Sequence, residues 1–433
     1  MLIEWDTTPR FANPRRVRGP IVTPETDLAA TVALALPPEP QTIVYRIRFE
    51  REAARGASDW GVGRFATPRA DGFRVAWTGD TCGQGYGRNP DFGGLPGYAA
   101  LRAAEPAVFV HSGDLFYADN PILPERKEHD GRIWRNITNE RVARVAQELD
   151  DFRARIAYNA EDDHVRALAA EVSIVAQWDD HETHNNWFPG QQLADDRYRD
   201  RDASRLAALA LRAIHEWYPI TPGPVHRVLH YGPLLDIVVV DLRSFRTPND
   251  ANRGDTGVLF GAAQAKWLAD TLAASRARWK IVAIDQPFSV VIDDGPTAQE
   301  GFGNGDGGAP LGRERELAQI FDQLRAHQVK NVVWVTADVH FAAAHRCTRL
   351  GDSPVWQFIA GPIHAGSFSV ELDATFGPEV AFEWKPPKGS PPLGPWDGLQ
   401  NFGLVDVSPD ALAVCLVGTD GLVRYRVELP YAA

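Results

Sequence analysis

Six aspartates that follow apolar runs of strand length are the residues of this sequence most able to act together. They are Asp80, Asp114, Asp180, Asp241, Asp285 and Asp338. A single aspartate in such a place is most often a turn residue or a helix N-cap. In an α/β sheet, however, the carboxyl ends of the strands face one crevice, so six aspartates there would form an acidic cluster. Bound cations are the natural way to neutralise the repulsion within such a cluster.

Histidine and tyrosine accompany three of these aspartates. His181 directly follows one aspartate, His340 lies two residues after another, and Tyr117 lies three residues after a third. Oxygen and nitrogen ligands of these kinds suit iron, manganese, zinc or calcium. The three cysteines form no Cys-x-x-Cys pair, which excludes a thiolate-rich zinc knuckle. The pattern therefore predicts a metal site built on carboxylates.

The elements that must position these residues alternate between strand and helix from residue 73 onward. The predicted strands are 73–78, 107–111, 172–177, 234–240, 279–284, 331–336, 355–360 and a hairpin of 412–417 with 423–429. The predicted helices are 98–104, 138–157, 206–217, 262–274 and 313–326. Together they indicate an α/β fold whose central strands are buried on both faces.

The first 70 residues lack a helical pattern. Short strand-like runs at 2–5, 29–36 and 42–49 are separated by prolines, which predicts a small antiparallel β unit. This unit begins with a strand at residue 2, as if earlier strands were missing. Because residues 67–71 resemble a linker, we expect a domain at 1–70 and a larger one at 71–433.

Composition narrows the class of protein. The chain has 45 lysines and arginines against 57 aspartates and glutamates, a net charge of −12, which argues against a nucleic-acid-binding surface. Bound cations would still let it handle an anionic substrate. No apolar run approaches the roughly 20 residues of a membrane helix. The first residues show no basic region leading into an apolar one, so we expect no signal peptide.

Four sequence motifs carry a family resemblance. They are T-G-D-T-C-G-Q-G, S-G-D-L-F-Y, W-D-D-H-E-T-H-N-N-W and T-A-D-V-H, beginning at residues 78, 112, 178 and 336. In order and spacing they resemble the motifs of PhoD-type alkaline phosphatases, within the calcineurin-like and purple-acid-phosphatase-like metallophosphoesterases. The resemblance implies a β-sandwich flanked by helices, preceded by a truncated fibronectin-like unit. Members of the family are usually exported.

The resemblance also implies two metal ions, a ferric ion and a divalent Ca²⁺, Mn²⁺ or Zn²⁺. Their ligands would be Asp80, Asp114, Tyr117, Asp180, Asn186, Asp338 and His340, with Asp114 bridging both ions and Tyr117 on the ferric ion. Many members place a cysteine where this chain has Asp80, so Cys82 is the alternative first ligand. We favour Asp80, because the strand end points it into the crevice. Asp338 and His340 are expected on an extended segment, where both would face one ion.

The remaining candidates would contact a phosphate-ester substrate. His181 would protonate the leaving oxygen or stabilise the charged oxygens, and with Asp114 it forms the catalytic pair that the resemblance implies. Asn185, Arg243 and His364 are further candidate substrate contacts. Arg243 has a salt bridge to the preceding aspartate as its alternative role, and His364 has that of a hydrogen-bonded structural histidine.

The predicted activity is hydrolysis of phosphate monoesters, diesters or both by attack of a metal-bound hydroxide. One alternative is a metallohydrolase that uses the same ions on non-phosphate esters. Another is a non-catalytic, metal-stabilised binding protein, which would keep the acidic cluster but would not need His181.

Overall fold

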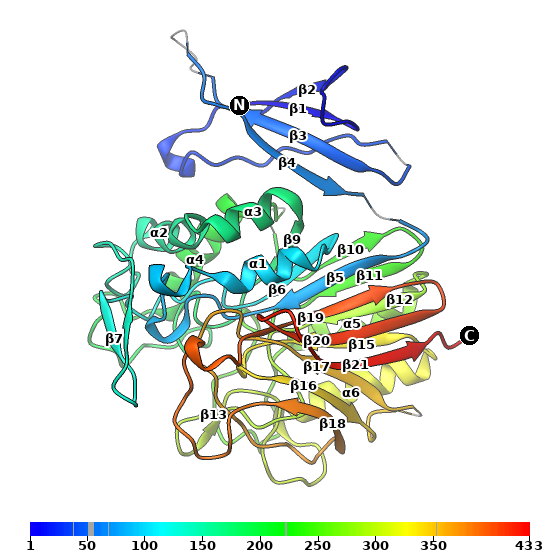
Figure 1. Cartoon of the computed structure of the whole chain (residues 1–433). Coiled ribbons are helices and arrows are strands. Elements are labelled where there is room, and N and C mark those ends of the chain that lie inside the picture. The colour runs from blue at the N-terminus through cyan, green and yellow to red at the C-terminus, as the bar shows by residue number, and fades with distance from the viewer. Residues whose placement is uncertain (38, 51–55, 68, 221–222, 352) are drawn as a thin grey trace.

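The computed structural model describes residues 1–433 except 38, 51–55, 68, 221–222 and 352. Two sheets packed face to face, with helices outside them, form the large domain, and a separate small sheet forms the N-terminal unit (Figure 1). Among the described residues, we find no helix whose length and apolar character would let it cross a membrane.

The first large sheet carries three of the predicted aspartate loops, which follow its three parallel strands. Its strands lie in the order β21 (Val423–Pro430), β20 (Ala411–Gly418), β19 (Asn401–Val407), β5 (Phe73–Thr78), β6 (Val108–Ser112) and β9 (Ser173–Gln177). Strands β5, β6 and β9 run parallel, so their carboxyl ends lie at the same edge. The predicted C-terminal hairpin is β20 with β21.

The second large sheet supplies the remaining aspartate loops. Its order is β10 (Arg227–Tyr231), β11 (Leu235–Val239), β12 (Trp279–Ala283), β15 (Val332–Thr336), β17 (Val355–Ile359), β16 (Ala342–Cys347) and β18 (Pro378–Trp384). Strands β11, β12, β15 and β17 run parallel. Short pairs β7 (Glu125–Lys127) with β8 (Ile133–Arg135), and β13 (Asp293–Asp294) with β14 (Ala298–Gln299), lie in loops.

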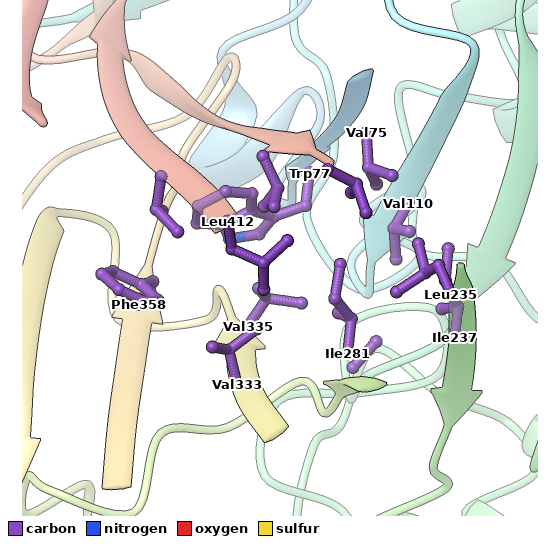
Figure 2. Close-up of a cluster of buried hydrophobic side chains, with 14 of the residues drawn as sticks. Val75, Trp77, Val110, Leu235, Ile237, Ile281, Val333, Val335, Phe358 and Leu412 are labelled. Atoms are coloured by element: carbon purple, nitrogen blue, oxygen red, sulfur yellow. The ribbon is translucent and has the colours of Figure 1, made fainter. Parts of the chain in front are cut away.

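Apolar side chains fill the space between the two sheets (Figure 2). Val75 and Trp77 of β5 meet Ile281 and Val335 of the other sheet. The intervening Ala76 belongs to a different cluster, on the outer face. Alternate residues of β5 are thus buried on opposite faces, which confirms the predicted α/β fold and holds the strand ends in place.

Helices cover the outer faces. Helices α1 (Pro96–Ala103) and α3 (Asp163–Glu171) contribute to the cluster outside the first sheet. Helices α5 (Gly261–Ala274) and α6 (Gly312–Ala326) cover the second sheet. Helices α2 (Leu149–Ala160) and α4 (Ala203–Trp217) pack on each other. Short 3₁₀ helices occur at Pro24–Thr26, Gly83–Gly85, Pro90–Phe92 and Pro395–Asp397.

Two predicted elements differ from the structure. The helix expected at 138–157 begins only at Leu149, because the Asn139 side chain accepts the backbone N–H groups of Arg141 and Val142 in a turn that competes with the helix. Val142 is buried but outside the helix. The strand expected at 29–36 does not form.

The N-terminal unit is an antiparallel sheet in the order β2 (Arg15–Arg18), β1 (Leu2–Asp6), β3 (Thr42–Arg48) and β4 (Gly61–Ala66). It contacts the large domain through hydrogen bonds such as Tyr45 Oη to the Ala170 carbonyl at 3.1 Å and Trp217 Nε1 to Asp27 Oδ2 at 2.8 Å. The fibronectin-like assignment of this unit and the boundary at residue 70 remain predictions.

Candidate metal centre

The loops that follow β5, β6, β9 and β15 bring the predicted ligands to one edge of the two sheets. Three groups of side chains there have ligand atoms within 4.8 Å of one another. The groups are Asp80, Asp114 and His340; Asp114, Asp180 and His181; and Asp179, Asp180 and Asp338. Because Asp114 belongs to the first two groups, its carboxylate lies between them. This is the position that a bridging ligand needs.

Tyr117 joins the first group. Its hydroxyl oxygen lies 3.1 Å from His340 Nε2, which lies 3.2 Å from Asp80 Oδ1. Burial, and then the carboxylates of Asp114 and Asp80, raise the pKa of the Tyr117 phenol well above its usual value. A carboxylate, an imidazole and a phenol therefore converge on one point.

The ligand oxygens at this edge are buried and lack partners. Both carboxylate oxygens of Asp80, Oδ1 of Asp180 and Oδ2 of Asp338 have no hydrogen-bond partner among the described residues. A buried carboxylate without a partner costs several kcal/mol or more, unless a cation or a proton compensates it. These residues therefore fit the cations that the fold suggests.

The backbone at the ligands is left-handed. Asp80, Asp114, Asp338 and His340 have φ values of 66°, 51°, 63° and 59°. Each such residue costs about 1–3 kcal/mol and persists only where the surrounding structure enforces it. Tight turns directly after the strands thus aim the side chains back over the sheet edge.

This geometry corrects the prediction for Asp338 and His340. Strand β15 ends at Thr336, and the following residues turn instead of continuing in an extended conformation. Asp338 consequently falls in the group of Asp180, while His340 falls in that of Asp80. The two side chains do not share one group, as an extended segment would require.

Cys82, the alternative first ligand, lies elsewhere. It is buried in an apolar cluster with Tyr98 and Leu101, and burial raises the pKa of its thiol. Among the described residues, no candidate ligand group contains it. The candidate ligand group beyond β5 therefore contains Asp80 and not Cys82.

A second carboxylate orients His181. Nδ1 of His181 lies 2.8 Å from Asp119 Oδ1, and the imidazole stacks on the Tyr117 ring at 4.1 Å between centroids. Burial lowers the pKa of His181, but the carboxylates of Asp119, Asp180 and Asp114 outweigh burial and raise this pKa well above its usual value. Asp119 was not predicted as a site residue, because the only sign of its role in the sequence is its position two residues after Tyr117.

The cavity above these groups has a volume of about 510 Å³. Asp114, Asp180, His181, Asn185 and Asn186 line it, together with Gln84, Asp119, Asn120, His184, Arg197, Ile292, Asp293, Glu300, Asp338, Val339, His340, Phe368 and Val370. Of these lining residues, only Arg197 is an arginine or lysine. Six acidic residues therefore face one arginine across the wall, so bound cations would be needed to attract an anion.

Comparisons with known proteins show the family of the chain. The PhoD-like phosphatase family model matches residues 75–414, which is most of the chain. The chain belongs to the PhoD-like phosphatase family. Alkaline phosphatase D of Bacillus subtilis (strain 168) is 28% identical to it over 255 residues, which are 54% of this chain and 41% of that protein. The chain thus matches less than half the length of this curated relative.

Solved structures agree with the fold. The structure titled "Structure of PhoD" superposes with a TM-score of 0.72 at 18% identity, covering 100% of this chain and 85% of that one. A weaker likeness is "GAP50 the anchor in the inner membrane complex of Plasmodium", with a TM-score of 0.45, 12% identity and coverage of 84% and 90%. The first likeness shows the fold, and the second is too slight to carry an argument.

In this PhoD-like phosphatase, Arg243 does not reach the cavity. It is fully buried below the ligand groups, where Nε donates to Asp179 Oδ1 at 2.7 Å and Nη1 pairs with Glu300. Its backbone N–H, and not its guanidinium, bonds to Asp241. The guanidinium therefore neither lines the cavity nor forms a salt bridge with Asp241. It lies beneath the site, where it offsets part of the carboxylate charge.

His364 braces the first-ligand loop from behind. Its N–H donates to the Asp80 carbonyl at 3.1 Å, and its carbonyl accepts from Cys82 N–H at 2.8 Å. Burial lowers the pKa of the imidazole to about 4, and Nε2 lies 3.3 Å from the Gly87 carbonyl. This position fits the structural alternative and not a substrate contact.

The asparagines act partly through their backbone. Asn185 N–H donates to Asp119 at 2.9 Å, and Asn186 N–H donates to Asp180 at 2.6 Å. The Asn186 amide nitrogen donates to Asp294 at 3.0 Å. Both residues therefore hold the carboxylates around them, besides lining the cavity.

Glu182 ties two ligand loops together, a role the sequence did not reveal. Its carboxylate accepts Leu115 N–H at 2.6 Å and Asp179 N–H at 2.9 Å. Burial raises the pKa of Glu182 to about 8. It links the loop that carries Asp114 to the loop that carries Asp180.

Proposed function

We propose that this PhoD-like phosphatase hydrolyses phosphate monoesters, diesters or both at a centre of two cations. The observation that carries the proposal is the pair of buried ligand groups that share Asp114 and hold carboxylate oxygens without hydrogen-bond partners. Such a pair suits two ions held side by side by a common carboxylate.

Two sets of ligands drawn from these groups fit different ions, and Asp338 joins the second set through its group with Asp180. Asp80, Asp114, Tyr117 and His340 offer oxygen and nitrogen with a phenol, which suits a ferric ion. Asp114, Asp180 and Asp338, with Asn186 beside them, offer oxygen, which suits Ca²⁺, Mn²⁺ or Zn²⁺. When bound, two such cations supply Lewis acidity, which activates water and neutralises charge on the phosphate.

His181 holds the proton for the leaving oxygen. Asp119 occupies Nδ1 and Tyr117 stacks on the ring, so Nε2 remains for the substrate. Burial lowers the pKa of this imidazole, and the carboxylates of Asp119, Asp180 and Asp114 raise it. Of these, Asp119 is not a proposed metal ligand, so it would still favour the protonated ring with cations bound. A positioned proton donor of this kind is worth about 10²–10⁴-fold in rate.

Arg197 takes the phosphate-contacting role that the sequence had suggested for Arg243. Its side chain is half exposed at the cavity wall and is bound to Asp195, with Nη2 to Oδ2 at 2.6 Å. A guanidinium matches two phosphate oxygens in its planar fork. Arg197 would bind the substrate phosphate from the rim, on the solvent side of the cations.

The test compares three aryl substrates: p-nitrophenyl phosphate, bis(p-nitrophenyl) phosphate and p-nitrophenyl acetate. We expect hydrolysis of at least one phosphate substrate, its loss on chelation, its return with added metal, and inhibition by inorganic phosphate. Hydrolysis of the acetate alone, without phosphate inhibition, would instead identify a metallohydrolase of non-phosphate esters. Bound metal with no turnover of any substrate would identify a binding protein.

A further inference from the structure

A second large cavity lies between the N-terminal sheet and the large domain. Its volume is about 580 Å³, and no described residue that lines it also lines the metal cavity. The sheet contributes Ile3, Tyr45, Ile47 and Phe65 from one face. The opposite wall comes from α2, α3, β6 and β9, which lie below the sheet in Figure 1.

The lining of this interdomain cavity is apolar. Phe109, Ile156, Val165 and Ile174 are among its side chains on the large domain. Apart from histidine, the one lining side chain that carries a charge is Arg64, which pairs with Glu171 at 3.2 Å. The lining side chains therefore present no unbalanced charge to an occupant.

The size is that of a ligand site. Small-molecule sites have volumes of about 300–1,000 Å³ and are mostly apolar with a few polar groups. Voids left by imperfect packing are far smaller, since protein interiors are close-packed. The interdomain cavity satisfies both the size and the lining of such a site.

One polar side chain offers an anchor. His111, at the carboxyl end of β6, lines the cavity and is only 3% exposed. Its Nε2 lies 2.9 Å from Thr81 Oγ1, while Nδ1 has no hydrogen-bond partner among the described residues. A buried ring nitrogen without a partner is costly, and a ligand hydroxyl or carbonyl would satisfy it.

We propose that the interdomain cavity binds an uncharged, hydrocarbon-rich small molecule that carries one hydrogen-bonding group. The apolar walls exclude water from its hydrocarbon part, and His111 takes its polar group. The site lies behind the segments that carry two metal ligands, since Thr81 N–H donates to the Asp114 carbonyl at 3.0 Å and Leu115 lines the cavity.

The test is a fluorescence titration of the full chain with N-phenyl-1-naphthylamine, an uncharged apolar probe. We expect saturation at one probe per chain and displacement by 1-dodecanol. Ala169→Phe and Ala160→Phe fill the cavity from α3 and α2, and each should weaken probe binding about tenfold. The matched control is Ala263→Phe, which adds the same side chain to an exposed position of α5 and should leave binding unchanged.

Thermal melts identify any variant that fails to fold. If one of the two cavity-filling variants fails to fold, the probe affinity of the other one tests the proposal. Asp114→Asn should bind the probe as the wild type does, since its carboxylate belongs to the other cavity. Non-saturable binding, or unchanged binding in the folded filled variants, would overturn the proposal. A dimer whose interface covers the cavity would also overturn the proposal. Sedimentation would show this dimer in the wild type and its dissociation in Ala169→Phe, and the dimer would not bind the probe.

Discussion

Two of the ligand groups, that of Asp80, Asp114 and His340 and that of Asp179, Asp180 and Asp338, differ in chemistry and in the contacts that support them. The group of Asp80 and His340 includes an imidazole and lies beside the Tyr117 phenol. Phe368 stacks on the His340 ring at 4.5 Å, and the Gly366 carbonyl accepts from His340 Nδ1. This group is held by aromatic stacking and backbone.

The group of Asp180 and Asp338 offers only carboxylates, and it is held by charge. Asp179 in this group pairs with the buried Arg243, which also contacts Glu300. The arginine removes part of the negative charge on one side of the centre, while the other side has no such cation among the described residues. The proposed two-cation centre would therefore offer its ions two unlike settings, and single substitutions on each side test this difference.

The largest effect should come from Asp114→Asn, because its carboxylate belongs to two of the three ligand groups and is proposed to hold both ions. We expect both ions to be lost, and turnover of aryl phosphates to fall by about 10⁴-fold or more, since each ion contributes to charge neutralisation. Elemental analysis and steady-state kinetics measure the two losses. Two metals per chain with a near-normal rate would mean that Asp114 is no bridge.

The two groups should separate in a matched pair of variants. His340→Ala should lose the ion of the first group, and Asp338→Asn should lose the ion of the second, each with a fall of about 10³-fold in turnover. Metal identity by elemental analysis distinguishes the two losses. If both variants lost the same ion, the two residues would share one ion, as an extended segment had suggested.

His181→Ala should keep both metals but lose about 10²–10⁴-fold in turnover. The loss should shrink for substrates with acidic leaving groups, because these leave without a proton. Rates are compared across a series of aryl phosphates of rising phenol pKa. An equal loss for all of them would rule out a general acid, and loss of metal would make His181 a ligand, which its place beside Asp114 and Asp180 allows.

The Tyr117→Phe substitution should change the visible absorption of the iron-loaded protein more than its turnover rate. A phenolate on a ferric ion gives a visible charge-transfer band, and we expect this band in the wild type and its absence in the variant. Turnover should fall less than about tenfold, because the other ligands of the first group remain. An iron-loaded, active wild type without such a band would remove Tyr117 from the ligands.

The smallest effect should come from Arg197→Gln at the cavity rim. A half-exposed charge contact is worth up to about 1 kcal/mol, so KM for p-nitrophenyl phosphate should rise about fivefold with kcat nearly unchanged. The matched control is Arg199→Gln, since Arg199 is 76% exposed, pairs with Glu148 and does not line the cavity. Equal KM values for both variants would show that Arg197 does not touch the phosphate.

Much of the fold could be predicted because its signals are local. Strand β5 has the predicted bounds of 73–78, and five other strands that carry aspartates lie within two residues of the prediction. Apolar runs and their period depend on neighbouring residues alone. The helix expected at 138–157 was too long, because one asparagine side chain changed the local competition for backbone N–H groups.

The candidate site was harder to predict from the sequence, because it depends on turn conformations and on contacts between residues distant in sequence. The alternation of residues along a strand does not reveal that Asp338 and His340 take left-handed backbone conformations. Because of these conformations, the two side chains lie in different ligand groups. Arg243 and Arg197 look alike as sequence. Only the fold shows that Arg243 is buried against Asp179, 64 residues away, while Arg197 lines the cavity.

Anomalous X-ray scattering from crystals of the metal-loaded protein tests the central claim most directly. Data collected on either side of the iron edge, and at a wavelength sensitive to the divalent ion, locate each cation independently of activity. The account predicts one peak among Asp80, Asp114, Tyr117 and His340, a second among Asp114, Asp180 and Asp338, and Asp114 bound to both. A single peak, or two peaks without Asp114 between them, would contradict it.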